Sequence, residues 1–122
     1  MPSWNPSCER WLDATLPQIL PVQKRKLFGY PAWFEYGRMR LCLIETGLGI
    51  KSDPGVIRSV KDSGVPLKDF TRLGRDAGRT WTLFALTPAE GSWDEDALRF
   101  ALGLLLSVPV PEGRSKTDRR PR

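Results

Sequence analysis

Hydrophobic and polar residues alternate with a period of two through residues 26–51, in the centre of the chain. This period is typical of β-strands, because successive side chains of a strand point to opposite faces of the sheet. Gly37 and Gly47 interrupt the alternation, and glycine readily adopts the positive φ angles of tight turns. The pattern therefore predicts three short strands side by side, joined by two tight turns.

The alternation also predicts which side chains share a face in the second of these strands. One face would carry Met39, Leu41 and Leu43. The residues expected on the opposite face are Arg40, Cys42 and Ile44.

Two flanking segments have the hydrophobic spacing of three to four residues that amphipathic helices show. The first helix is predicted to begin at Ser7, as N-cap, and to end before Pro17. The second is predicted to have Asp53 as its N-cap, Pro54 in its first position and Gly64 at its end.

A third helix is predicted to begin at Ser92, which fits a capping box with Glu95, and to stop before Pro109. Its last turns are apolar nearly all round, so it must be buried on more than one side. We favour burial against a second copy of the chain, since a small domain has little interior in which to hide such a helix. The expected dimer face comprises Leu98, Leu102, Leu105 and Leu106.

Two further strands are predicted at residues 70–74 and 79–86, with a polar turn at 75–78. The order helix, three strands, helix, two strands, helix is typical of an α+β domain with a five-stranded sheet packed by helices. The chain has 122 residues, enough for one domain, which we assign to residues 1–111. Residues 112–122 lack the hydrophobic side chains that could order them and are expected to form a flexible basic tail.

The net charge of +5 suggests a polyanionic partner. The tail holds five basic and two acidic residues, so the rest of the chain carries only +2. Basic residues near the centre could still contact nucleic acid or another anion, while Tyr30 and Trp33 offer rings for stacking. The competing interpretation is a solvated turn, with the aromatic rings in the core. The candidate anion contacts are Lys24, Arg25, Lys26, Arg38 and Arg40.

The chain offers no recognisable catalytic or cofactor-binding motif. It has no histidine, which is the commonest general base and a frequent zinc ligand, no CxxC pair and no phosphate-binding loop. The acidic cluster Asp94, Glu95 and Asp96 fits the first turn of a helix, where negative charge is favoured. We therefore expect a non-enzymatic protein with no catalytic residues, no metal and no cofactor.

Cys8 and Cys42 are two thiols far apart in the sequence, which fits a reducing compartment. No hydrophobic stretch has the length of a membrane span, and the N-terminus lacks the pattern of a signal peptide. The expected location is the cytoplasm, without a membrane partner.

Residues 24–53 combine a basic start, the element Phe28-Gly29-Tyr30, an aromatic-rich strand and the turn Gly37-Arg38-Met39. In this combination the chain resembles the TfoX N-terminal domain family, the TfoX/YjbR-like small α+β domains. The resemblance extends from Leu12 to Val108, with the capped, leucine-rich last helix included. It implies a curved, mainly antiparallel sheet, a frequently dimeric state and a bacterial cytoplasmic protein. It implies no catalytic residue.

These observations favour an interaction or regulatory domain that acts through dimerisation or a protein partner. The first alternative is a nucleic-acid-binding module. The second is a small-ligand pocket between the sheet and the last helix, with Lys51 or Arg40 as polar anchor. The expected ligand or partner surface comprises Phe28, Tyr30, Trp33 and Lys51.

Overall fold

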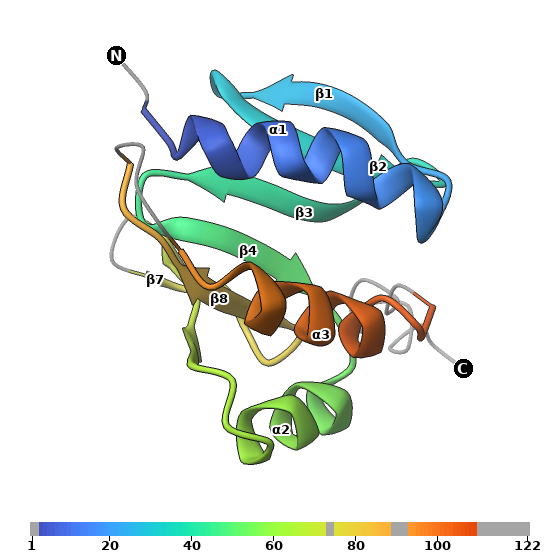
Figure 1. Ribbon diagram of the computed structural model, residues 1–122, viewed down its shortest axis with the longest axis vertical. Helices are drawn as coiled ribbons and strands as arrows, with labels where there is room; N and C mark the ends of the chain where they lie inside the picture. The colour runs from blue at the N-terminus through green and yellow to red at the C-terminus, as the bar shows by residue number, and fades with distance from the viewer. Residues whose placement is uncertain (1–2, 73–74, 89–92, 110–122) are drawn as a thin grey trace, which may run out of the picture.

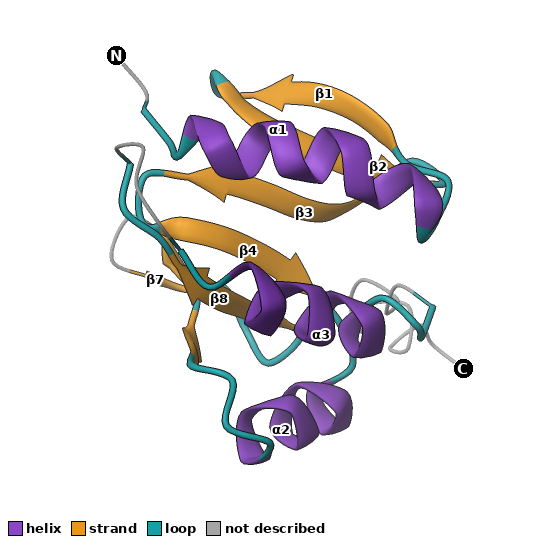
Figure 2. Ribbon diagram, in the orientation of Figure 1, coloured by secondary structure: helices purple, strands orange, loops and turns teal. Residues whose placement is uncertain are grey.

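The computed structural model describes residues 3–72, 75–88 and 93–109. These residues form three α-helices, a six-stranded sheet and a two-stranded ribbon (Figures 1 and 2). The helices are α1 (Pro6–Thr15), α2 (Pro54–Asp62) and α3 (Glu95–Leu105), and a short 3-10 helix, η1 (Leu16–Gln18), follows α1. The strands are β1 (Gln23–Leu27), β2 (Tyr30–Glu35), β3 (Arg38–Ile44), β4 (Gly47–Lys51), β5 (Leu67–Asp69), β6 (Thr71–Arg72), β7 (Arg75–Asp76) and β8 (Trp81–Ala85).

All neighbouring strands of the sheet run antiparallel, in the order β1-β2-β3-β4-β8-β5. The predicted α+β class, with helices packed on an antiparallel sheet, is confirmed. The predicted number of five strands is wrong, because β1 and β5 form the two edges of a six-stranded sheet. Hydrophobic alternation does not predict β1, because four of its five residues are Gln23 and three consecutive cations.

The strand predicted at residues 79–86 is confirmed by β8, whereas the described part of the strand predicted at 70–74 contributes β6 to a separate ribbon and not to the sheet. β8 pairs with β5 on one side and with β4 on the other, while β6 and β7 pair with each other in a separate ribbon. β7 occupies part of the predicted polar turn at 75–78.

The ends of the first two helices follow from local side-chain chemistry. α2 begins as predicted, because Oδ2 of Asp53 accepts hydrogen bonds from the first turn, and Gly64 follows its end with a φ of +100°. α1 is capped by Asn5 rather than by Ser7: Asn5 Oδ1 accepts from the Cys8 amide at 3.0 Å. The predicted cap was misplaced by two residues because both side chains are good caps.

α3 is capped by Asp94, whose Oδ1 accepts from the Ala97 amide at 3.0 Å. The helix ends at Leu105, earlier than predicted. The predicted cap Ser92 and the predicted tail at 112–122 lie outside the described residues.

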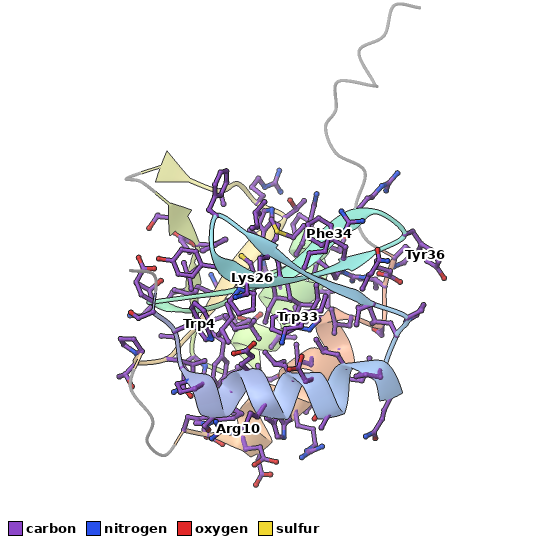
Figure 3. All side chains as sticks on the ribbon, turned by 90° about the horizontal axis from the view of Figure 1, so that it is seen from above. Trp4, Arg10, Lys26, Trp33, Phe34 and Tyr36 are labelled. Carbon is purple, nitrogen blue, oxygen red and sulfur yellow. The ribbon has the colours of Figure 1, made fainter. Side chains whose placement is uncertain are left out.

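The three helices pack on one face of the sheet, which we call the helix face (Figure 1). Its core joins Leu12 of α1, Ile57 of α2 and Leu102 of α3 to strand residues such as Leu41. We call the opposite side the open face. Its smaller cluster consists of strand residues and Phe70, and no described helix contributes to it. Figure 3 shows Trp33 between the sheet and α1, with Phe34 on the side away from α1.

The core of the helix face contains the four leucines of the predicted dimer face. None of them is more than 5% exposed. The sheet and α2 pack against α3, and the rings of Trp11 and Trp93, which contact each other edge to face, pack against the same core. The predicted dimer face is therefore wrong, since one chain hides these side chains by itself. They are Leu98, Leu102, Leu105 and Leu106.

A β-bulge in β3 changes which side chains lie on which face. Trp33 of β2 pairs with Leu41, and Phe34 pairs with Met39, so Arg40 is the extra residue. The bulge turns Arg40 towards the helix face, where its side chain is fully buried and reaches the end of α3.

The Arg40 guanidinium binds acceptors from several parts of the chain. Its Nη2 donates to the carbonyls of Leu105 at 3.1 Å and Val108 at 2.7 Å, and its Nε donates to the Lys51 carbonyl at 2.9 Å. Its Nη1 donates to Oε1 of Glu35 at 2.6 Å. The last carbonyls of a helix lack partners within the helix, and its negative end favours a cation. Arg40 therefore connects β2, β3 and β4 to α3.

We predict that Arg40→Ala lowers the free energy of unfolding by about 3–5 kcal/mol, because it removes the cation that pairs with the partly buried Glu35 and one of the donors at the end of α3. Arg40→Lys should cost about 2 kcal/mol, since one ammonium group cannot reach all four acceptors. Urea unfolding followed by tryptophan fluorescence measures both. As a control, the exposed Arg58→Ala should change the value by less than about 0.5 kcal/mol. An equally small loss for Arg40→Ala would contradict the prediction.

Candidate functional site on the open face

The open face contains an apolar hollow of about 160 Å³. It spans β1, β2 and β3, and Phe70 forms its wall on the side of β4. Hydrocarbon and sulfur atoms make up almost all of its surface. The lining residues are Leu27, Phe28, Tyr30, Met39, Cys42, Ile44 and Phe70.

The register of β2 and β3 places the lining of the hollow. Ala32 pairs with Cys42, and beyond the bulge Phe34 pairs with Met39. Both pairs belong to the open-face cluster. Without the extra residue Arg40, the alternation of the strand would place Met39 on the helix face. The bulge therefore supplies Met39 to the hollow.

Gly49 of β4 makes room for the Phe70 ring. A Cβ at this position would lie 2.8 Å from Cε2 of Phe70, so even alanine would displace the ring. Phe70 also packs against Trp81, with their ring centroids 5.5 Å apart. These contacts hold Phe70 in place as a wall of the hollow.

Phe28 is the exposed residue at the rim of the hollow. It lies in the two-residue turn between β1 and β2 with a φ of +53°, followed by Gly29 with a φ of +85°. Turns with two positive φ angles favour Asn, Asp or Gly, because a Cβ is strained there. The side chain is 85% exposed, so packing within the described chain does not offset this strain. Tyr36 repeats the arrangement in the turn between β2 and β3, with a φ of +52° and 81% exposure.

Lys24 of the edge strand β1 is held against α1 by two carboxylates. Its Nζ donates to Glu9 at 2.7 Å and to Asp13 at 2.8 Å. Partial burial alone would lower the pKa of Lys24, but these hydrogen bonds and charges raise it above its usual value. Burial alone would raise the pKa of Glu9, but hydrogen bonds from Lys24 and Trp4 lower it. The charge of Lys24 is therefore compensated within the chain.

The next two cations of β1 form no ion pair with any described residue. Arg25 lies on the open face, with its guanidinium carbon 5.0 Å from the centroid of the Phe34 ring. Lys26 lies on the helix face, with Nζ 5.5 Å from the centroid of the Trp4 ring (Figure 3). The charge of Lys26 also helps to lower the pKa of Glu9 without an ion pair between them. Two cations whose charges no ion pair compensates thus flank the edge strand on opposite faces.

The structure brings together two of the four residues predicted as a ligand or partner surface. Phe28 and Tyr30 both line the hollow, and the Tyr30 hydroxyl donates to Oε1 of Glu45 at 2.6 Å. The prediction is wrong for Trp33, which is 2% exposed and belongs to the core. It is also wrong for Lys51, whose carbonyl accepts from the Arg40 side chain at the end of β4, outside the hollow.

The five predicted anion contacts do not form one surface. The prediction is wrong for Arg40, which is fully buried. Lys24 is bound to carboxylates, Arg25 and Lys26 point to opposite faces, and Arg38 lies at the other end of β2. The predicted ligand pocket between the sheet and the last helix is likewise filled by the core of the helix face.

A second, polar cleft of about 280 Å³ lies between α2 and the β5–β8 edge of the sheet. Its walls carry the cations Arg58, Lys61 and Arg79 and the anions Asp62 and Asp69. Lys61 and Asp69 approach to 3.8 Å. Because the opposite charges nearly balance, the cleft favours no single class of ligand.

Within residues 3–72, 75–88 and 93–109, no group of three His, Cys, Asp or Glu side chains is placed to hold a metal ion. No helix in these ranges has the length and apolar character needed to cross a membrane. The chain matches no protein-family model, and comparisons with curated proteins and with solved structures found no match.

Five residues of the hollow are not among the predicted site residues: Leu27, Met39, Cys42, Ile44 and Phe70. β3 does carry a signal for Met39, Cys42 and Ile44, because it is hydrophobic on both faces, as strands covered on both sides are. The bulge and the position of Phe70 depend on contacts between distant segments, which hydrophobic alternation does not record.

We predict that Glu9→Gln reduces the loss of stability in acid. The folded-state pKa of Glu9 is lowered, so its charge stabilises the protein above the ordinary value of 4.5, and this contribution is lost as the pH falls through the folded-state pKa. Glutamine keeps an acceptor for the Trp4 indole but has no charge. The fall in Tm between about pH 6 and about pH 3 should therefore be smaller in the variant.

The matched control is Asp62→Asn, which removes an exposed carboxylate that forms no ion pair with the described residues. Its fall in Tm should equal that of the wild type. If Glu9→Gln behaves like this control, the Glu9–Lys24 contact does not contribute to stability.

Proposed function

We propose that the protein is a non-enzymatic binding domain that holds a protein partner against the open face of its sheet. The observation that carries this proposal is Phe28, a strained and exposed aromatic residue beside an apolar hollow.

Phe28 is unfavourable for the isolated chain in two ways. A positive φ costs a residue with a Cβ about 1 kcal/mol relative to glycine. Leaving the ring in water forgoes a further 2 kcal/mol or so of burial. Strained residues of this kind are concentrated at binding sites, where another molecule supplies the compensating contacts. This supports a contact between Phe28 and a partner.

The hollow has the size and chemistry to receive one apolar side chain. A cavity of about 150 Å³ with a comparable lining takes up benzene, so the hollow suits an aromatic ring or a leucine. Met39 adds an adaptable side chain to the lining, and aromatic residues and methionine are enriched in protein interfaces. A small molecule inside the hollow would leave most of the Phe28 ring in water, whereas a protein surface would cover both the hollow and the ring. We therefore favour a protein partner over a small ligand.

We propose a non-enzymatic function because the lining of the hollow is almost entirely apolar and does not direct several ionisable groups towards one point. We also propose, on the sequence motifs alone, that the chain is a divergent relative of the TfoX N-terminal domains. The thiols of Cys8 and Cys42 are buried and form no disulfide within the described residues, which is consistent with the cytoplasm as its compartment.

The test is a selection of peptides from a random display library on immobilised protein. We predict that the selected peptides carry an aromatic or aliphatic residue and bind Phe28→Asn at least about tenfold more weakly than the wild type, because the central anchor is gone. Asparagine accepts the left-handed conformation, so the variant should be as stable as the wild type or up to about 1 kcal/mol more stable.

Tyr36→Asn is the matched control, because it makes the same change in an equivalent turn outside the hollow. It should leave peptide affinity within about twofold of the wild type. Equal binding to Phe28→Asn, or equal losses in both variants, would contradict the proposal.

A further inference from the structure

We infer that the partner presents an extended strand that pairs with the outer edge of β1 and carries two adjacent acidic residues followed or preceded by an apolar one. This inference rests on the proposed function and specifies the partner of the same surface. It depends on the edge, on the charges and on the register of β1.

The edge of β1 is available for another strand. In the part of the chain that the structure describes, β1 pairs with β2 alone, and it forms the upper boundary of the sheet in Figure 1. It is five residues long, whereas β5 at the other edge has three. An added strand hydrogen-bonds to the exposed backbone groups of such an edge, and its side chains supply specificity.

The charges on β1 select an acidic strand. Arg25 and Lys26 form no ion pair with the described residues, whereas Lys24 already binds two carboxylates. Cations on an edge strand prevent indiscriminate pairing, and opposite charges on a partner convert the same feature into specificity. Antiparallel pairing of two β1 edges would bring cations near cations, which disfavours a second copy at this edge.

The register of β1 orders the partner's residues. Arg25 lies on the open face, Lys26 on the helix face and Leu27 again on the open face, at the hollow. Side chains of a paired strand alternate in the same way, so the residues opposite these three are acidic, acidic and apolar. The apolar residue then lies beside Phe28 and the hollow. A helix cannot place two consecutive carboxylates on the two faces of a sheet, so an extended strand fits better.

The experiment uses fluorescein-labelled eight-residue peptides of threonine and serine with a central Phe-Glu-Glu or Glu-Glu-Phe, to cover both strand directions. Their counterparts carry lysine in place of glutamate. Anisotropy titrations compare the wild type with the double variant Arg25→Glu, Lys26→Glu, and with Arg25→Gln, Lys26→Gln. Circular dichroism checks that these exposed substitutions keep the fold.

We expect one glutamate peptide to bind the wild type and to lose about tenfold in affinity with the charge-reversed variant, which should instead prefer the lysine peptide. The affinity of the glutamine variant for the glutamate peptide should lie between the affinities of the wild type and the charge-reversed variant. Hydrogen exchange of residues 23–27 should slow in the complex, and N-methylation of alternate peptide amides should abolish binding.

The inference would be overturned if neither glutamate peptide binds, or if the charge-reversed variant binds the glutamate peptide with unchanged affinity. It would also be overturned if binding leaves the hydrogen exchange of β1 unchanged. In each case, library peptides that still require Phe28 would leave the proposed function standing. If those peptides are also indifferent to Phe28→Asn, both proposals fail.

Discussion

The buried guanidinium of Arg40 is the interaction on which the arrangement of the sheet and the last helix depends. A buried charge is tolerated only with an ion-pair partner and with its donors satisfied. Glu35 supplies the opposite charge, and the carbonyls of Lys51, Leu105 and Val108 accept the other donors. Ser52 donates to the Leu105 carbonyl as well, at 2.7 Å. The end of α3 is therefore fixed to the sheet by hydrogen bonds as well as by the leucines of the core.

The bulge that buries Arg40 also shapes the open face. In a regular strand, Arg40 would share the open face with Cys42, and Met39 would share the helix face with Leu41. The extra residue reverses this from position 40 towards the start of β3. A cation leaves the open face and a methionine enters it. The charge network on the helix face and the apolar hollow on the open face thus have one structural cause.

Features with local causes could be predicted from the sequence, and features with distant causes could not. α2 was predicted correctly because Asp53 and Gly64 act within a few residues of their own positions. β1 was missed because its exposed cations are accommodated by side chains far along the chain, such as Glu9 for Lys24. The expectation that the last helix is buried on more than one side is correct for Leu98, Leu102, Leu105 and Leu106, whereas Leu104 is 39% exposed. Whether the cover comes from α2 and the sheet or from a second chain is a property of the packing. Of the candidate site, Phe28 and Tyr30 were found because aromatic residues beside Gly29 stand out in the sequence.

The division into a filled face and an open face limits where a partner can bind without disturbing the fold. Core side chains fill the space between the sheet, α1 and α3, and the cleft beside α2 is polar with nearly balanced charges. The open face and the β1 edge meet at Phe28, which ends the edge strand and lines the hollow at once. The backbone conformation of the turn fixes the position from which the Phe28 side chain extends, because Phe28 and Gly29 both adopt the positive φ angles of a two-residue turn. The proposed partner strand along β1 and its apolar side chain in the hollow would therefore form one continuous contact, with Phe28 at the junction between them.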